Sequence, residues 1–113
     1  MTSALRRSPW TPWAGLFAGA AGWFLHQQGG AGANYWDCRF GGPLWTVGLG
    51  LVSAAIILAG GWISWSARRA PEGGEDLPGA RRFGGTVGAI AALVFLFAVA
   101  LQTLGGLIVP ACP

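Results

Sequence analysis

Lysine is absent from this sequence, and charge of either sign is scarce: Asp, Glu and Arg together make up 10% of the 113 residues. Ordinary soluble domains carry about 25% charged residues. Hydrophobic residues account for 53% of the chain, which is too apolar for a soluble domain of this size. The length leaves room for one domain, and the composition indicates contact with lipid.

Two residue types are abundant instead. The chain contains 20 Gly and 7 Trp, which membrane proteins use where helices touch and at the level of the lipid headgroups. The basic residues are all Arg and fall mainly in pairs beside apolar segments. Despite a pI near 9.7, this distribution does not form the basic face that binds nucleic acid. We therefore expect the lipid bilayer, and no nucleic acid, as a partner.

Three long stretches contain no acidic or basic residue except one His. They are residues 8–36, 40–67 and 83–113. A helix rises about 1.5 Å per residue and needs roughly 20 residues to cross the hydrocarbon core, and each stretch supplies that many. The sequence therefore predicts an all-α integral membrane protein, a single three-helix bundle. We place the spans near residues 10–28, 44–66 and 83–109.

The first expected span is the least apolar and allows a second interpretation. Residues 14–22 are mostly Ala and Gly, and the span ends in the polar residues 26–28. Arg6 and Arg7, an apolar stretch and then Ala-Gly-Ala at residues 31–33 resemble a secretory signal with a small-residue cleavage site. Trp residues at both ends of the stretch favour a retained helix. In either case the later spans keep the same orientation.

The arginine positions predict the orientation, because basic residues in short loops stay on the cytoplasmic side. Only Arg39 lies in the first loop. The other six precede the first span or flank the second loop: Arg6, Arg7, Arg68, Arg69, Arg81 and Arg82. Acidic residues in the second loop do not alter this expectation, since the rule counts Lys and Arg alone. We expect the N-terminus in the cytoplasm and the C-terminus outside, in a bacterial inner membrane.

Small residues four positions apart suggest where the helices touch, because transmembrane helices associate through close backbone approach. Such pairs occur in each expected span: Gly15 and Gly19, Gly50 and Ala54, Gly84 and Gly88. A chain this rich in Gly and Ala also produces such pairs by chance. The spacing therefore suits a tight bundle without proving one.

His26 and Gln102 are the candidate polar or ligand site. His26 is the only His and falls at the outer end of the first span, where an imidazole could ligate a haem iron or pass a proton near a quinone. Beside Gln27 and Gln28, an interfacial polar residue is the simpler interpretation. Gln102 lies about 10 Å below the outer end of the third span, in the same half of the bilayer. We expect a hydrogen bond between His26 and Gln102, within the chain or to a neighbour.

Cys38 and Cys112 both face the oxidising compartment under this topology. Neither belongs to a C-x-x-C pair, so a catalytic dithiol has little support. We predict a structural disulfide that ties the end of the third helix to the first outer loop. The alternative is a redox-active pair in a thiol or quinone oxidoreductase, although such enzymes typically carry a second pair of cysteines.

Several segments together resemble a known group of proteins. They are the Arg-bearing start and residues 26–28, 36–39, 60–65, 101–104 and 108–112. The pattern is similar to small three-helix proteins found with haem-copper terminal oxidases in proteobacteria. The resemblance covers most of the chain and implies a respiratory accessory role with other membrane subunits as partners, but it supplies no catalytic residue.

The spans contain no Asp, Glu or Arg, and carriers generally need a charged group on their ion pathway. An independent transporter is therefore disfavoured. No catalytic residue, metal site or cofactor is predicted. We expect a non-catalytic structural, accessory or assembly subunit of a respiratory membrane complex.

Overall fold

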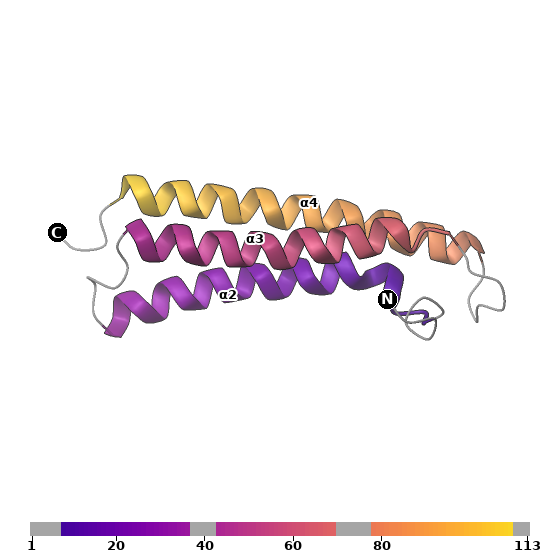
Figure 1. The fold of residues 1–113 in the computed structure, drawn as a ribbon, viewed down its shortest axis with the longest axis horizontal. Helices are drawn as coiled ribbons and strands as arrows, with labels where there is room; N and C mark the ends of the chain where they lie inside the picture. Colours follow the sequence, from indigo (N-terminus) through magenta and orange to yellow (C-terminus); the bar gives the residue numbers. More distant parts are fainter. Residues whose placement is uncertain (1–7, 37–42, 70–77, 110–113) are drawn as a thin grey trace.

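The computed structural model describes residues 8–36, 43–69 and 78–109. Its elements are a short 3-10 turn η1 (Thr11–Trp13), α2 (Ala14–Trp36), α3 (Pro43–Ser66) and α4 (Pro78–Ile108). The three long helices run side by side with alternating direction, and each contacts the other two (Figure 1). The predicted all-α class with three long helices is confirmed over the described residues.

Prolines open α3 and α4. Pro43 and Pro78 are the first residues of these helices, where the missing N–H has no carbonyl partner to lose and the fixed φ suits a helix. α4 therefore begins before Phe83, the expected start of the third span. That start was placed after the Arg pair at residues 81–82. Charge limits an apolar span, but a helix keeps its own backbone hydrogen bonds in polar surroundings and continues through the pair.

α2 continues past Gln28, the expected end of the first span, and runs to Trp36. Its contact with α3 persists beyond that point. The indole of Trp45 donates a hydrogen bond to the carbonyl oxygen of Gly29 at 3.3 Å, and the Leu49 side chain lies against Gly29. A run of polar and small side chains therefore does not end the helix, because packing against α3 continues on its far side.

The buried apolar core is small. Its fully buried members are Ile57, Ala92 and Val99, with Trp23, Phe95 and Leu96 packed against them. Much of the remaining contact is made by backbone and small side chains. The buried residues of α3 recur every three or four positions: Gly50, Ser53, Ile57, Gly60 and Ser64. This spacing puts them on one face of α3, which is turned toward α2 and α4.

Glycines from the predicted small-residue pairs lie in these contacts. A Cβ on Gly15 would meet the carbonyl group of Gly88, and one on Gly50 would lie 2.6 Å from Oγ1 of Thr103. Real Cβ atoms do not approach neighbours this closely, so the helices could not keep their spacing with larger residues. Close backbone approach is the association mode expected between helices in lipid.

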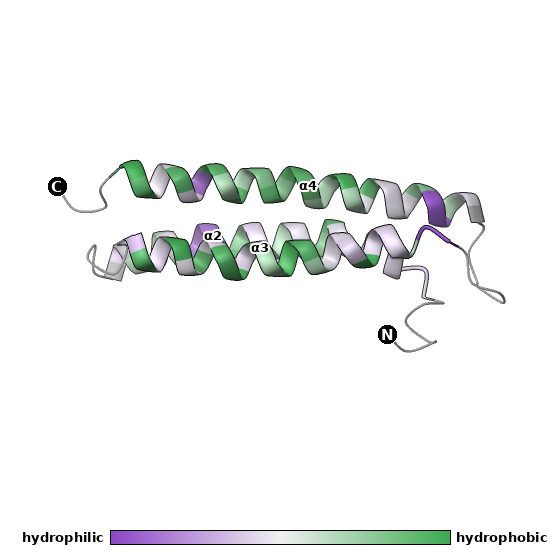
Figure 2. Ribbon diagram, turned by 45° about the horizontal axis from the view of Figure 1, so that its top comes forward, coloured by the Kyte–Doolittle hydropathy of each residue, from purple (hydrophilic) through white to green (hydrophobic). Residues whose placement is uncertain are grey.

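Hydrophobic residues run along most of α4 and much of α3 (Figure 2), and many of their large apolar side chains are exposed. Among the described residues, two helices are long and apolar enough to cross a membrane, Pro43–Ser66 and the Gly79–Ile108 part of α4. Within the most apolar 18-residue stretch of each helix, only 22% and 17% is buried inside the bundle. α2, the least apolar span by sequence, does not meet the same criterion. Most of the apolar surface of α3 and α4 therefore faces away from the protein.

Candidate functional site

A layer of polar side chains joins α2 to α4. His26 is 7% exposed, and its Nε2 lies 3.1 Å from the hydroxyl oxygen of Thr103. The next residue of α2, Gln27, pairs with the residue before Thr103 on α4: Nε2 of Gln102 donates to Oε1 of Gln27 at 2.7 Å. The sequence singled out His26 and Gln102, and the structure brings both into this layer. The hydrogen bonds run from His26 to Thr103 and from Gln102 to Gln27.

The Thr103 hydroxyl determines the role of the imidazole. Its proton is donated to the carbonyl oxygen of Val99 at 2.8 Å within α4. A hydroxyl has one proton, so toward His26 the same oxygen acts as an acceptor and Nε2 of His26 carries the donated proton. The Nε2 atom is thus occupied by a helix-to-helix hydrogen bond. A metal ion could reach this imidazole only through Nδ1, and the described residues contain no cluster of His, Cys, Asp or Glu that could hold a metal.

His26 does not lie at the end of its helix. Because α2 continues to Trp36, the imidazole is about 15 Å from the helix end. The expected position of His26 at the outer end of the first membrane span stays a prediction, because a helix can continue beyond the lipid. The side chain is an internal link of the bundle, while one atom of the layer stays unsatisfied: Oε1 of Gln102 is buried without a hydrogen-bond partner.

Arg81 is the polar residue that the sequence interpretation missed. It was counted as a flanking topology signal, yet it is 1% exposed. Its Nε donates to the carbonyl oxygen of Arg69 at 3.2 Å, and its Nη1 donates to the carbonyl oxygen of Ser8 at 3.1 Å. Arg81 therefore joins the start of α4 to the chain after α3 and to the segment before η1.

The sequence did contain a signal for this burial. Arg81 is followed at helical spacing by Gly84, Gly85 and Gly88, all of which are buried. A side chain that continues a stripe of small residues points the same way as that stripe. The spacing thus indicates that Arg81 faces the other helices. The sequence interpretation missed this, because a pair of arginines beside an apolar run is typical of the border of a membrane span.

The exposed tryptophans gather near the helix ends. They are Trp10, Trp45, Trp62 and Trp65. At the end of α3 the guanidinium carbon of Arg68 lies 4.2 Å from the centroid of the Trp65 ring, a cation–π contact. Amphipathic rings of this kind favour the boundary between hydrocarbon and headgroups.

The predicted disulfide cannot be placed, because Cys38 and Cys112 both lie outside the described residues. It stays a prediction. Comparisons of the chain with known protein families, curated proteins and solved structures find no match.

Proposed function

We propose that this chain is an integral membrane protein that crosses a bacterial inner membrane three times, with its N-terminus inside, and acts as a non-catalytic subunit of a larger membrane complex. The observation that carries the proposal is the exposed apolar surface of α3 and α4. Only 22% and 17% of the most apolar stretch of these two helices is buried inside the bundle. An equally apolar helix in the core of a soluble protein would be mostly buried. Surfaces of this size in contact with water would aggregate.

Helix lengths support three crossings. The 23, 24 and 31 residues of α2, α3 and α4 correspond to about 34, 36 and 46 Å, and the hydrocarbon core is about 30 Å thick. α2 is less apolar than the others, but it packs against both of them. Its buried His26 and its Gln27 have partners on α4, which lowers the cost of carrying polar groups into lipid.

An accessory role fits the way the polar groups are used. His26 and Arg81 are both engaged in hydrogen bonds that hold the bundle together. The apolar outer face offers a surface for neighbouring transmembrane helices and for lipid. The resemblance to small three-helix proteins found with haem-copper terminal oxidases supports a respiratory complex as the partner.

The test is to follow a chromosomally tagged copy of the chain. We expect it to stay in the membrane after an alkaline carbonate wash and to migrate on native gels with a terminal oxidase or its assembly factors. Deletion should lower the amount of assembled oxidase. The control is an unrelated tagged three-span protein expressed at the same level. Migration only as a small free species, with oxidase assembly unchanged on deletion, would refute the respiratory role.

A further inference from the structure

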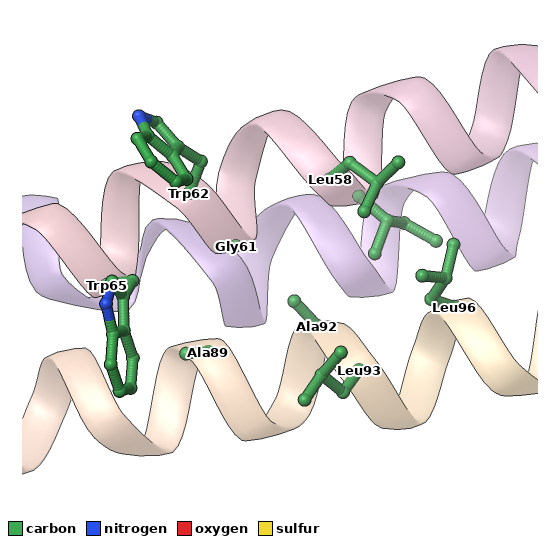
Figure 3. A pocket seen from close by; sticks show the side chains of 9 residues that line it. Leu58, Gly61, Trp62, Trp65, Ala89, Ala92, Leu93 and Leu96 are labelled. Carbon is green, nitrogen blue, oxygen red and sulfur yellow. The ribbon is translucent and has the colours of Figure 1, made fainter.

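A groove between α3 and α4 is lined by apolar residues only (Figure 3). Its volume is about 320 Å³. The lining residues are Ile57, Leu58, Gly61, Trp62, Trp65, Ala89, Ala92, Leu93 and Leu96. The small residues Gly61, Ala89 and Ala92 leave the space open, leucines lie at one end, and Trp65 reaches from α3 toward Ala89 at the other.

A second, basic pocket begins at the same tryptophan. It has a volume of about 540 Å³ and is lined by Trp65, Ser66, Arg68, Arg69 and Arg82. Three arginines therefore line this pocket, and no acidic residue is among the described lining residues. Arg68 stacks on Trp65 at 4.2 Å, and its Nε is buried without a hydrogen-bond partner. The pocket thus contains an arginine whose guanidinium group is positioned by the Trp65 ring.

We propose that the groove and the basic pocket form one binding site for an anionic phospholipid. The phosphodiester binds among Arg68, Arg69 and Arg82, and one acyl chain lies in the groove past Trp65. The site rests on the proposed membrane insertion. In the expected topology it belongs to the cytoplasmic leaflet, where clusters of basic residues beside transmembrane helices bind anionic headgroups.

The order of the two pockets favours a lipid over other anions. Along α3 the lining changes from leucine through tryptophan to arginine as the helix approaches its end at Ser66. A phospholipid has the same sequence of apolar chain, interfacial region and charged phosphate over its length. A soluble phosphate would use the basic pocket and leave the groove empty. A partner helix would need acidic groups placed at its own end.

The first experiment measures lipid binding to the full-length purified protein in neutral detergent by native mass spectrometry. The probes are phosphatidylglycerol and phosphatidylcholine with identical dioleoyl chains. We expect phosphatidylglycerol to bind about tenfold more tightly, because its net negative charge meets three arginines. Soluble glycerol phosphate should not displace it at equal concentration. Equal binding of the two lipids, or full displacement by glycerol phosphate, would overturn the proposal.

Variants test the two parts of the site separately. R68Q should weaken phosphatidylglycerol several-fold, whereas R39Q, which removes the same charge between the far ends of α2 and α3, should not. A89L should fill the groove and weaken both lipids, whereas A100L, at an exposed position on α4, should leave binding unchanged. If A89L fails to fold, the R68Q and R39Q pair still decides the headgroup assignment. Equal binding by R68Q and R39Q would overturn it.

Failure of this inference is distinguishable from failure of the proposed function. A chain that stays in washed membranes and migrates with the oxidase, yet shows no lipid preference, has lost the lipid site only. If carbonate releases the chain from membranes, the chain does not span the bilayer on which the lipid site depends. That result would refute both the proposed function and the lipid site.

Discussion

The glycine at position 15 sets how closely α2 and α4 approach each other. A Cβ there would meet the carbonyl group of Gly88 and would lie 2.9 Å from the hydroxyl oxygen of Ser64. The same hydroxyl accepts a hydrogen bond from the Gly15 backbone N–H. Neither a backbone carbonyl nor a bonded serine can move aside cheaply, so the absence of a side chain at Gly15 is part of the packing.

We therefore predict that Gly15→Ala lowers the stability of the bundle. Alanine is favoured over glycine inside a helix by about 1 kcal/mol, but forcing atoms into a filled contact costs roughly 1 to 3 kcal/mol. Thermal unfolding in mild detergent should show a lower Tm. Gly30→Ala is the matched control, because a Cβ at that position of α2 meets no atom within 4 Å. A Tm for Gly15→Ala at or above that of the wild type would contradict the close contact.

Arg81 provides the second test at a single position. Arg81→Gln removes the charged donors that reach the carbonyl oxygens of Ser8 and Arg69. Each hydrogen bond to a charged group contributes about 1.5 to 3 kcal/mol, so we expect a clear fall in Tm and faster proteolysis of the segment before η1. Arg82→Gln removes the same charge from an exposed position and should change neither. Arg81→Lys should give an intermediate result, because a lysine keeps the charge but not the fork of donors.

The buried faces of α3 and α4 follow repeats of seven. On α3, Gly50, Ile57 and Ser64 are buried at seven-residue intervals, and on α4 so are Gly85, Ala92 and Val99. Such a period keeps one seam facing a partner helix along its length. Four of these six positions carry Gly, Ser or Ala, which lets the helices come close together, the mode by which helices associate in lipid; the other two, Ile57 and Val99, belong to the apolar core.

How much the sequence predicted differs between elements. α3 begins within one residue of its expected span, since an apolar run bounded by Pro43 and an Arg pair marks both ends. The first span was expected to end near Gln28, and the length of α2 beyond that residue was not predicted, since polar and small residues after it gave no helix signal. His26 and Gln102 were assigned to one layer from helix lengths alone, but their hydrogen-bond partners depend on how the helices are rotated. That rotation is set by glycine contacts across three helices, which single-helix spacing does not encode.

The pair of glutamines tests the contact between α2 and α4. Gln27→Leu and Gln102→Leu each remove one partner of the 2.7 Å hydrogen bond. In a double-mutant cycle we expect a coupling free energy of about 0.6 kcal/mol and at most roughly 2 kcal/mol, the range for hydrogen bonds between transmembrane helices. Unfolding in detergent micelles measures it. Gln28→Leu combined with Gln102→Leu is the control cycle. An equal coupling free energy in both cycles would mean that the hydrogen bond between Gln27 and Gln102 does not link the helices.

The arrangement of the three helices determines which loops and termini lie at the same end of the bundle, and this can be compared with the expected topology. The end of α3 and the start of α4 are at one end of the bundle, and the ends of α2 and α4 are at the other (Figure 1). The described arginines are all at the first end: Arg68, Arg69, Arg81 and Arg82. Basic residues concentrated at one end of a membrane bundle mark the cytoplasmic side.

The topology can be tested with a reporter enzyme that is active only outside the membrane. Fused after Cys112, the reporter should be active, whereas an insertion between Glu72 and Gly79 should be silent. A cytoplasmic reporter at the same two positions is the matched control and should give the opposite pattern. Because six of the seven arginines drive the expected orientation, the reverse result would show that another signal, such as the first span, determines it.

The same arrangement makes the predicted disulfide between Cys38 and Cys112 testable. Cys38 follows the end of α2 at Trp36 by two residues, and Cys112 follows the end of α4 at Ile108 by four. Both helix ends lie at the same end of the bundle (Figure 1), and an extended chain spans about 3.5 Å per residue. A disulfide requires the two Cα atoms within roughly 7 Å, so the bond would draw the chain after α4 toward the first loop.

We predict that neither thiol reacts with a labelling reagent under denaturing conditions until a reductant is added. In solution, closing a loop of this length would stabilise the fold by about 4 kcal/mol in the chain-entropy description. Helices held in a membrane already restrict both ends, so the gain should be smaller, and Cys112→Ser should lower abundance without preventing insertion. Cys38→Ser should have the same effect, and the double variant should add nothing further, because either change breaks the same bond. Labelling of both cysteines in unreduced protein from native membranes would show that the bond is absent and that the chain after α4 is not tied to the first loop.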